Sequence, residues 1–345
     1  MGKILIGLAL PKFGRINIMN YEKHKLVLHK NVFFGASRPE SHSQNHYFIT
    51  LPKIIISVVG FWLWSSITPA LAQSLPRLRP TLDQGLETLN QGIQLVQQGN
   101  LPQAIATFRQ AAQQNPQLAA AHYNLGLALR QNGELQAAAT AFYQATQVDP
   151  EFALAFANLG ASLLEGDNLS QAREYLQRAI QLDRNLGVAH YNMGLVLMRM
   201  GETNPAIASL QRAAQLSPNA PEPHYHSGLA YLRLQRLEEA KAALQRAIAL
   251  SPRYPEAQYN LGTIFLQQNN LTAALTAFNS SVQTNPNYPS SYYGAGLVLI
   301  RQQRYPEASQ ALQRARDLFQ SQGNNQWAAN ANQLLQSLPA RPVRR

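Results

Sequence analysis

Apolar residues in the middle of this chain recur with the spacing of amphipathic helices. Leu125 and Leu129 lie four residues apart, and after a polar interruption the pattern resumes at Leu135 and continues to Phe142. Such spacing predicts two short helices, each with one apolar face. The pattern returns every 34 residues, so that one large apolar position reads Phe108, Phe142, Leu176, Leu210, Leu244, Phe278 and Leu312. A fixed period of this length predicts a stacked array of similar units.

Small residues keep the same phase. A glycine recurs at Gly92, Gly126, Gly160, Gly194, Gly228, Gly262 and Gly296. An alanine recurs at Ala104, Ala138, Ala172, Ala206, Ala240, Ala274 and Ala308. Small side chains allow two helices to cross closely. Gly99, Gly133 and Gly201 predict a left-handed residue in the turn between the helices. Each unit is therefore predicted to be a helix, a turn and a second helix.

These markers resemble the tetratricopeptide repeat (TPR) family. The segments 121–126 and 258–262 match the first helix of that repeat, and Ala240, Leu244, Ala247 and Pro252 match the second. The resemblance implies an all-α fold, a right-handed α–α superhelix. With the recurrent glycine at position eight, the seven repeats of the 85–322 array are 85–118, 119–152, 153–186, 187–220, 221–254, 255–288 and 289–322.

The array departs from the family pattern at a few places. Thr88 and Gln258 stand where the family usually has a large aromatic residue, and Arg184 replaces the proline that closes most repeats. Because proline stops a helix, its loss predicts a looser joint between repeats three and four. After the last repeat, the apolar stripe of 323–338 predicts a capping helix, and 339–345 is a basic tail.

The first 84 residues differ from the repeats. Residues 1–50 form an N-terminal extension without clear periodicity. Within 51–72, Lys53 precedes a short apolar run that ends in Ala70-Leu71-Ala72, which is typical of a secretory signal cleaved after Ala72. The run lies unusually far from Met1, which favours either a misassigned start near Leu51 or an uncleaved membrane anchor. Residues 73–84 are interpreted as a linker. In both cases the repeats are expected outside the cytoplasm, membrane-anchored or exported to a periplasm-like space.

Composition limits the other functional classes. The chain contains no cysteine, which excludes a disulfide framework and thiolate metal ligands. Of its net charge of +11, six lie in residues 1–53, and the surplus of five in residues 73–345 is weak and scattered, so nucleic acid is not an expected partner. His122, His190 and His224 share repeat position four, which normally packs between helices, and no carboxylate accompanies them in a catalytic pattern. We therefore expect no enzyme, no cofactor and no metal site.

The resemblance also implies that the first helices line a concave groove. Asparagine amides there could pair with any peptide backbone, and tyrosines would add flat apolar area. The same residues are common in the family and can instead bond to neighbouring helices, so both interpretations stay open. The candidate partner-binding residues are Asn90, Tyr123, Asn124, Asn158, Tyr191, Asn192, Arg199, Tyr225, His226, Arg233, Tyr259, Asn260, Tyr293 and Arg301.

The sequence favours a non-enzymatic scaffold that binds an extended peptide or partner protein in this groove and supports complex assembly. An alternative is a regulatory or tethering subunit that recruits an enzyme or its substrate to an envelope machine. A sugar-transfer enzyme reduced to its repeats is a third, suggested only by the asparagines. The clamp for a terminal carboxylate found in some family members is absent, because position five is tyrosine or an apolar residue and not lysine.

Overall fold

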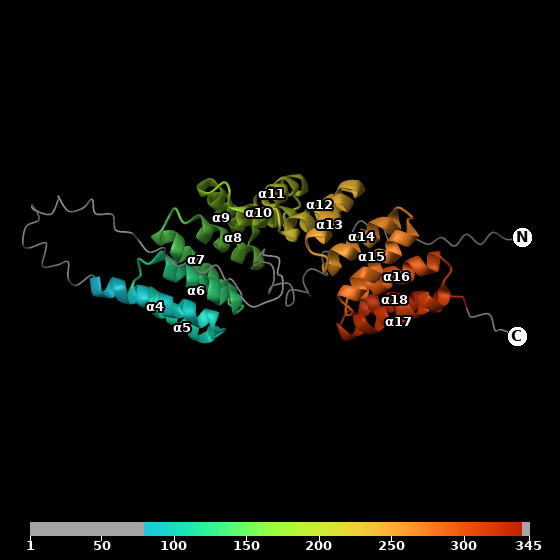
Figure 1. Cartoon of the computed structure of the whole chain (residues 1–345), viewed down its shortest axis with the longest axis horizontal. Coiled ribbons are helices and arrows are strands. Elements are labelled where there is room, and N and C mark those ends of the chain that lie inside the picture. The colour runs from blue at the N-terminus through green and yellow to red at the C-terminus, as the bar shows by residue number, and fades with distance from the viewer. Residues whose placement is uncertain (1–78, 340–345) are drawn as a thin grey trace, which may run out of the picture. The chain divides into compact units, whose positions relative to one another are not determined.

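The computed structural model describes residues 79–339, and Figure 1 shows them as a succession of paired helices. The predicted extension and signal segment lie outside this range, as do residues 73–78 of the predicted linker and residues 340–345 of the predicted basic tail. In the described part, fifteen helices match the fourteen repeat helices and the capping helix that the period predicts. They are α4 (Arg79–Gln97), α5 (Leu101–Gln114), α6 (Ala119–Gln131), α7 (Leu135–Val148), α8 (Ala153–Glu165), α9 (Leu169–Leu182), α10 (Gly187–Arg199), α11 (Thr203–Leu216), α12 (Pro221–Arg233), α13 (Leu237–Leu250), α14 (Pro255–Gln267), α15 (Leu271–Thr284), α16 (Pro289–Arg301), α17 (Tyr305–Ser321) and α18 (Asn325–Ser337).

Helix α4 begins earlier than the repeat period suggests. It starts at Arg79, whereas the first repeat was expected from residue 85, so the last part of the expected 73–84 linker is helical. The other first helices start within one or two residues of their repeat boundaries. At the C-terminal end, Trp327 and Ala328 of α18 pack on Ala315 and Phe319 of α17, covering apolar surface that a further repeat would otherwise bury.

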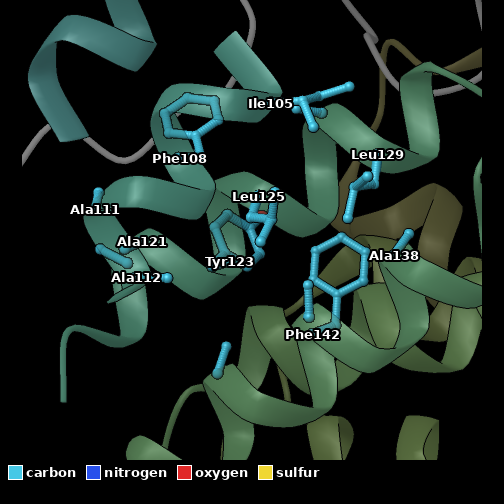
Figure 2. Packing of buried hydrophobic residues seen from close by; sticks show 14 of the residues in the cluster. Ile105, Phe108, Ala111, Ala112, Ala121, Tyr123, Leu125, Leu129, Ala138 and Phe142 are labelled. Atoms are coloured by element: carbon cyan, nitrogen blue, oxygen red, sulfur yellow. The ribbon is translucent and has the colours of Figure 1, made fainter. Parts of the chain in front are cut away.

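The helices of each repeat cross at the recurrent glycine. A Cβ built on Gly126 would lie 2.7 Å from the ring of Phe142, and one on Gly194 would lie 2.6 Å from Leu210 Cγ. Both distances are shorter than van der Waals contact, so only glycine lets the second helix come this close. Figure 2 shows the resulting core, in which Phe108 and Phe142 are fully buried beside Leu125 and Ala138. The phase of the repeats is thereby confirmed.

The turn inside each repeat contains the expected left-handed residue. Gly99, Gly133 and Gly201 have φ of +77°, +86° and +83°. The equivalent residues of the other four repeats adopt the same conformation without being glycine; they are Asp167, Gln235, Asn269 and Gln303. The turn geometry is therefore set by the packing of the two helices, and glycine only makes it less costly.

The described residues divide into two compact units, 79–218 and 219–339.

The joint between repeats three and four is packed like the others. The expectation that it would be looser is wrong, because Ala179 of α9 packs with Ala157 and Ala189 of the flanking helices. Arg184 can replace proline at this joint because the contact uses only its backbone. Its carbonyl oxygen accepts a hydrogen bond from His190 Nε2 at 3.0 Å. The same bond joins His122 to the carbonyl of Pro116 in the preceding joint. Any residue supplies this carbonyl, so the joint does not depend on proline.

Candidate functional site

The candidate residues lie on the first helices of the repeats, and tyrosine at position five is buried to a different degree in the two units. In the 79–218 unit, Tyr123 is 2% exposed and Tyr191 is 8% exposed. In the 219–339 unit, Tyr225, Tyr259 and Tyr293 are half-buried. Of the tyrosines at position five, those that a partner could touch therefore lie on α12, α14 and α16.

Most of the asparagines at position six are buried and bonded within the array. Asn124, Asn158, Asn192 and Asn260 are at most 7% exposed, whereas Asn90 in the first repeat is exposed. The Nδ2 atoms of Asn124 and Asn260 donate to the carbonyl oxygens four residues earlier, both at 2.8 Å. These amide donors are used by the protein's own backbone, which is the structural role that the sequence left open.

Asn158 also joins two repeats. Its Nδ2 donates to the Tyr123 hydroxyl at 3.2 Å and to the Leu154 carbonyl at 3.0 Å. Burial raises the pKa of Tyr123 well above its ordinary value, although nearby Arg130 and the bond from Asn158 oppose the shift. Arg130 in turn forms a salt bridge with Glu165 of the next repeat. This network holds repeats two and three together.

Two buried amide atoms keep hydrogen-bonding capacity. Asn124 Oδ1 and Asn192 Nδ2 have no hydrogen-bond partner among the described residues, and neither does His122 Nδ1. An unsatisfied buried polar atom costs about 1–3 kcal/mol, and all three atoms lie in buried residues, away from the surface that a partner could touch.

The arginines at position thirteen bond to the preceding repeat. Arg199 Nη1 donates to the Leu164 carbonyl at 2.8 Å and lies 3.2 Å from Asp167 Oδ1. Arg301 Nη1 donates to the Leu266 carbonyl at 3.2 Å. These carbonyls lie in the last turn of the preceding first helix, where each also accepts an amide of the following turn: Asp167 N donates to Leu164 O and Asn269 N to Leu266 O, both at 3.1 Å. Arg301 and Arg233 remain exposed at the surface, and Arg199 is half-buried.

His226 is the histidine among the candidate residues, and it is buried. It takes the place of asparagine at position six and is 7% exposed. Burial lowers its pKa to about 4, so the ring is neutral at pH 7. The Tyr225 ring packs edge-on against it, with ring centroids 5.0 Å apart. His226 is therefore a packing residue in this fold.

Sequence reasoning missed an aromatic contact between consecutive repeats. The residue just before a first helix packs on the tyrosine of the previous repeat: the ring centroids of Tyr225 and Tyr254 lie 4.8 Å apart, and those of Tyr259 and Tyr288 lie 5.6 Å apart. In the other unit Phe152 packs on Tyr123 in the same way. Aromatic residues at repeat position 34 were the available signal, because they precede the next helix by one residue.

Within residues 79–339 no group of three or more histidine, aspartate or glutamate side chains is placed to hold a metal ion. No helix in the same range is both long and apolar enough to cross a bilayer.

Comparisons with known proteins agree with the observed architecture. Family models described as tetratricopeptide repeat match residues 89–148, 191–255 and 225–291, and a second such model matches 153–186. No curated protein matches the chain.

Several solved structures share the fold at low identity. A tetratricopeptide repeat protein from Parabacteroides merdae has 16% identity and a TM-score of 0.54, over 74% of this chain and 98% of that one. Pseudomonas aeruginosa pilF has 19% identity and a TM-score of 0.55, over 60% and 95%. The APC/C hetero-tetramer Cut9-Hcn1 has 20% identity and a TM-score of 0.56, over 67% of this chain and 45% of that one. With the family models and the seven observed helix pairs, these findings show an all-α superhelical repeat fold, and the chain belongs to the tetratricopeptide repeat family.

Proposed function

We propose that this protein is a non-enzymatic scaffold that binds an extended segment of a partner protein on the face formed by its first helices. The fold supports a role in protein–protein interaction, since repeat arrays of this kind present extended surfaces to other proteins. The observation that carries the choice of face is the half-burial of Tyr225, Tyr259 and Tyr293 at one position of three successive first helices. Tyrosine supplies a large contact area with a polar tip, which is common in interfaces.

The accessible residues on this face differ from the buried ones in what they can contribute. In the 219–339 unit, the tyrosines of α12, α14 and α16 can touch a partner directly, as can Arg233 and Arg301. In the 79–218 unit, Asn90 is the exposed asparagine of the column. The buried asparagines would act by holding the first helices in register.

Affinity capture with matched variants tests this function. Tyr259→Ala removes half-buried ring area from the first-helix face, whereas Tyr143→Ala removes a 44% exposed ring from a second helix, α7. Proteins captured by the wild-type chain should be retained by Tyr143→Ala and lost from Tyr259→Ala, with both variants keeping their helical circular dichroism. Loss from Tyr143→Ala alone would move the interaction to the second helices and contradict the proposal.

We also propose that the repeats act outside the cytoplasm, exported or membrane-anchored, where they support assembly of a complex. The support is the sequence of 51–72, with a basic residue, a short apolar run and a small-x-small end. That segment lies outside the described residues.

A further inference from the structure

The 219–339 unit contains two packed pairs of tyrosine rings and a fifth tyrosine on the next first helix, which together we call the tyrosine cluster: Tyr225, Tyr254, Tyr259, Tyr288 and Tyr293. Tyr225 packs on Tyr254 and Tyr259 on Tyr288, at the distances given above. Tyr293 extends the group to Trp327 of the capping helix, with ring centroids 5.4 Å apart. All five tyrosines are half-buried. Each of these residues therefore keeps part of its surface accessible to solvent, over three repeats.

Two of these repeats place a carboxylate beside the rings. Glu222 and Glu256 occupy position two, in the first turns of α12 and α14. The other five repeats have apolar or small residues at this position: Leu86, Ala120, Leu154, Val188 and Ser290. Burial raises the pKa of Tyr288 well above its ordinary value, and the neighbouring Tyr225, Tyr259 and Glu256 raise it further. The acidic residues and the tyrosine cluster thus occur in the same part of the chain.

The half-buried carboxylate of Glu222 is not explained by a contribution to helix stability alone. An acidic residue in a first turn interacts favourably with the helix dipole, and it does so while exposed to solvent. Glu222 is half-buried, burial raises the pKa of its carboxyl group, and it has no salt-bridge partner among residues 79–339. A half-buried carboxylate without a cation costs free energy, which a positively charged ligand would recover.

The basic residues of this face lie at the other end of the helices. Arg233 and Arg301 are at position thirteen, and eleven residues of helix separate them from position two, which is about 16 Å. The face therefore has its carboxylates and aromatic rings at the start of the first helices, with exposed Arg253 just before α14, and the arginines of position thirteen at the other end. A cation is attracted to the carboxylates and rings.

We propose that the tyrosine cluster with Glu222 and Glu256 is a binding site for lysine or arginine side chains of a partner segment. Tyrosine faces attract cations through the ring quadrupole, and carboxylates pair with them directly. This inference rests on the proposed function, because it specifies the chemistry of the segment that the first-helix face binds.

The test uses the full chain and a fluorescent peptide of alternating lysine and serine. Fluorescence anisotropy should show binding that weakens as salt is raised, and the same peptide with acetylated lysines should not bind. Glu222→Gln should weaken binding roughly tenfold. Its control is Glu174→Gln, an exposed carboxylate on α9 in the other unit, which should leave binding unchanged.

The aromatic contribution is tested at Tyr288. Tyr288→Leu should weaken binding by about 2- to 30-fold, the range of cation–π interactions, and Tyr288→Phe should restore it because the ring is kept. Glu222→Gln removes a half-buried charge and is expected to fold, so its result stands even if Tyr288→Leu is unstable.

Equal binding of the acetylated peptide, or unchanged affinity in Glu222→Gln, would overturn the inference, and so would failure of the lysine peptide to bind. These results leave the proposed function intact if captured partners still depend on Tyr259. Loss of that dependence, with lysine-peptide binding retained, would instead refute the proposed function.

Discussion

At the scale of single residues, hydrogen bonds within the helices and between neighbouring repeats determine which polar side chains remain for a partner. Asparagine at position six is chemically suited to bind a peptide backbone, but in Asn124, Asn158 and Asn260 the Nδ2 donor already has an acceptor within the protein. Arg199 and Arg301 likewise donate to backbone carbonyls of the preceding repeat. Residues of this kind affect binding mainly through the stability of the array.

The first prediction separates the two roles of the asparagine column. Asn158→Ala should destabilise the protein by about 1–3 kcal/mol, because it leaves the buried Tyr123 hydroxyl without its bond. Asn90→Ala replaces the exposed asparagine at position six of the first repeat and should change the free energy of unfolding by less than about 0.5 kcal/mol. Urea denaturation followed by circular dichroism measures both. Equal stability of the two variants would show that the Tyr123–Asn158 bond does not hold these repeats together.

His226 gives a second prediction, for the dependence of stability on pH. Its pKa is about 4 in the folded protein and near 6.5 when unfolded, so the unfolded state binds more protons between these values. The contribution of the neutral ring to stability is complete above pH 6.5 and falls as the pH is lowered toward 4, by roughly 3 kcal/mol in total.

The measurement compares urea midpoints at pH 7 and pH 5. His226→Asn, which restores the residue found at this position in neighbouring repeats, should lose less stability between the two pH values than the wild-type chain does. An equal loss in both proteins would show that the titration of His226 does not control acid sensitivity.

At the scale of helices, the close crossing within each repeat is the most demanding feature of the fold. Gly194→Ala places a Cβ 2.6 Å from Leu210 Cγ and 3.3 Å from the Ala206 carbonyl, so α10 and α11 must move apart. Overpacking of this kind costs about 1–3 kcal/mol.

Gly166→Ala is the matched control for this crossing. Gly166 has a φ of −79°, and a Cβ there would meet nothing closer than 3.6 Å. Thermal unfolding should therefore show a lower midpoint for Gly194→Ala and an unchanged one for Gly166→Ala. A midpoint unchanged in Gly194→Ala would contradict the assigned crossing.

At the scale of the whole molecule, the sequence was sufficient to predict the fold but not the accessibility of the site. The 34-residue period predicts helix boundaries and the close-packed faces, because both depend on residue size and spacing. It does not predict that Asn158 bonds Tyr123, or that Arg199 reaches Leu164, since these contacts join residues 35 positions apart through packing of successive repeats. The same limit applies to Tyr123 and Tyr259, which share a position but are buried to different degrees.

Export is the prediction that concerns the whole chain. If the signal segment is cleaved, the mature protein begins at Gln73, and Ala72→Arg should block processing because arginine does not fit the small-residue position before the cleavage site. N-terminal sequencing of protein recovered from the envelope fraction checks this. Recovery of the full-length chain from the soluble cytoplasm would contradict export.

Site-specific photo-crosslinking in the producing cell tests the partner-binding role of the first helices most directly. A photoreactive phenylalanine analogue is placed at Tyr259 on α14 and, in a second protein, at Tyr143 on α7, which is the more exposed of the two residues. Binding on the first-helix face predicts discrete protein adducts from position 259 and none from position 143. Adducts from position 143 alone would contradict it and place the interaction on the second helices.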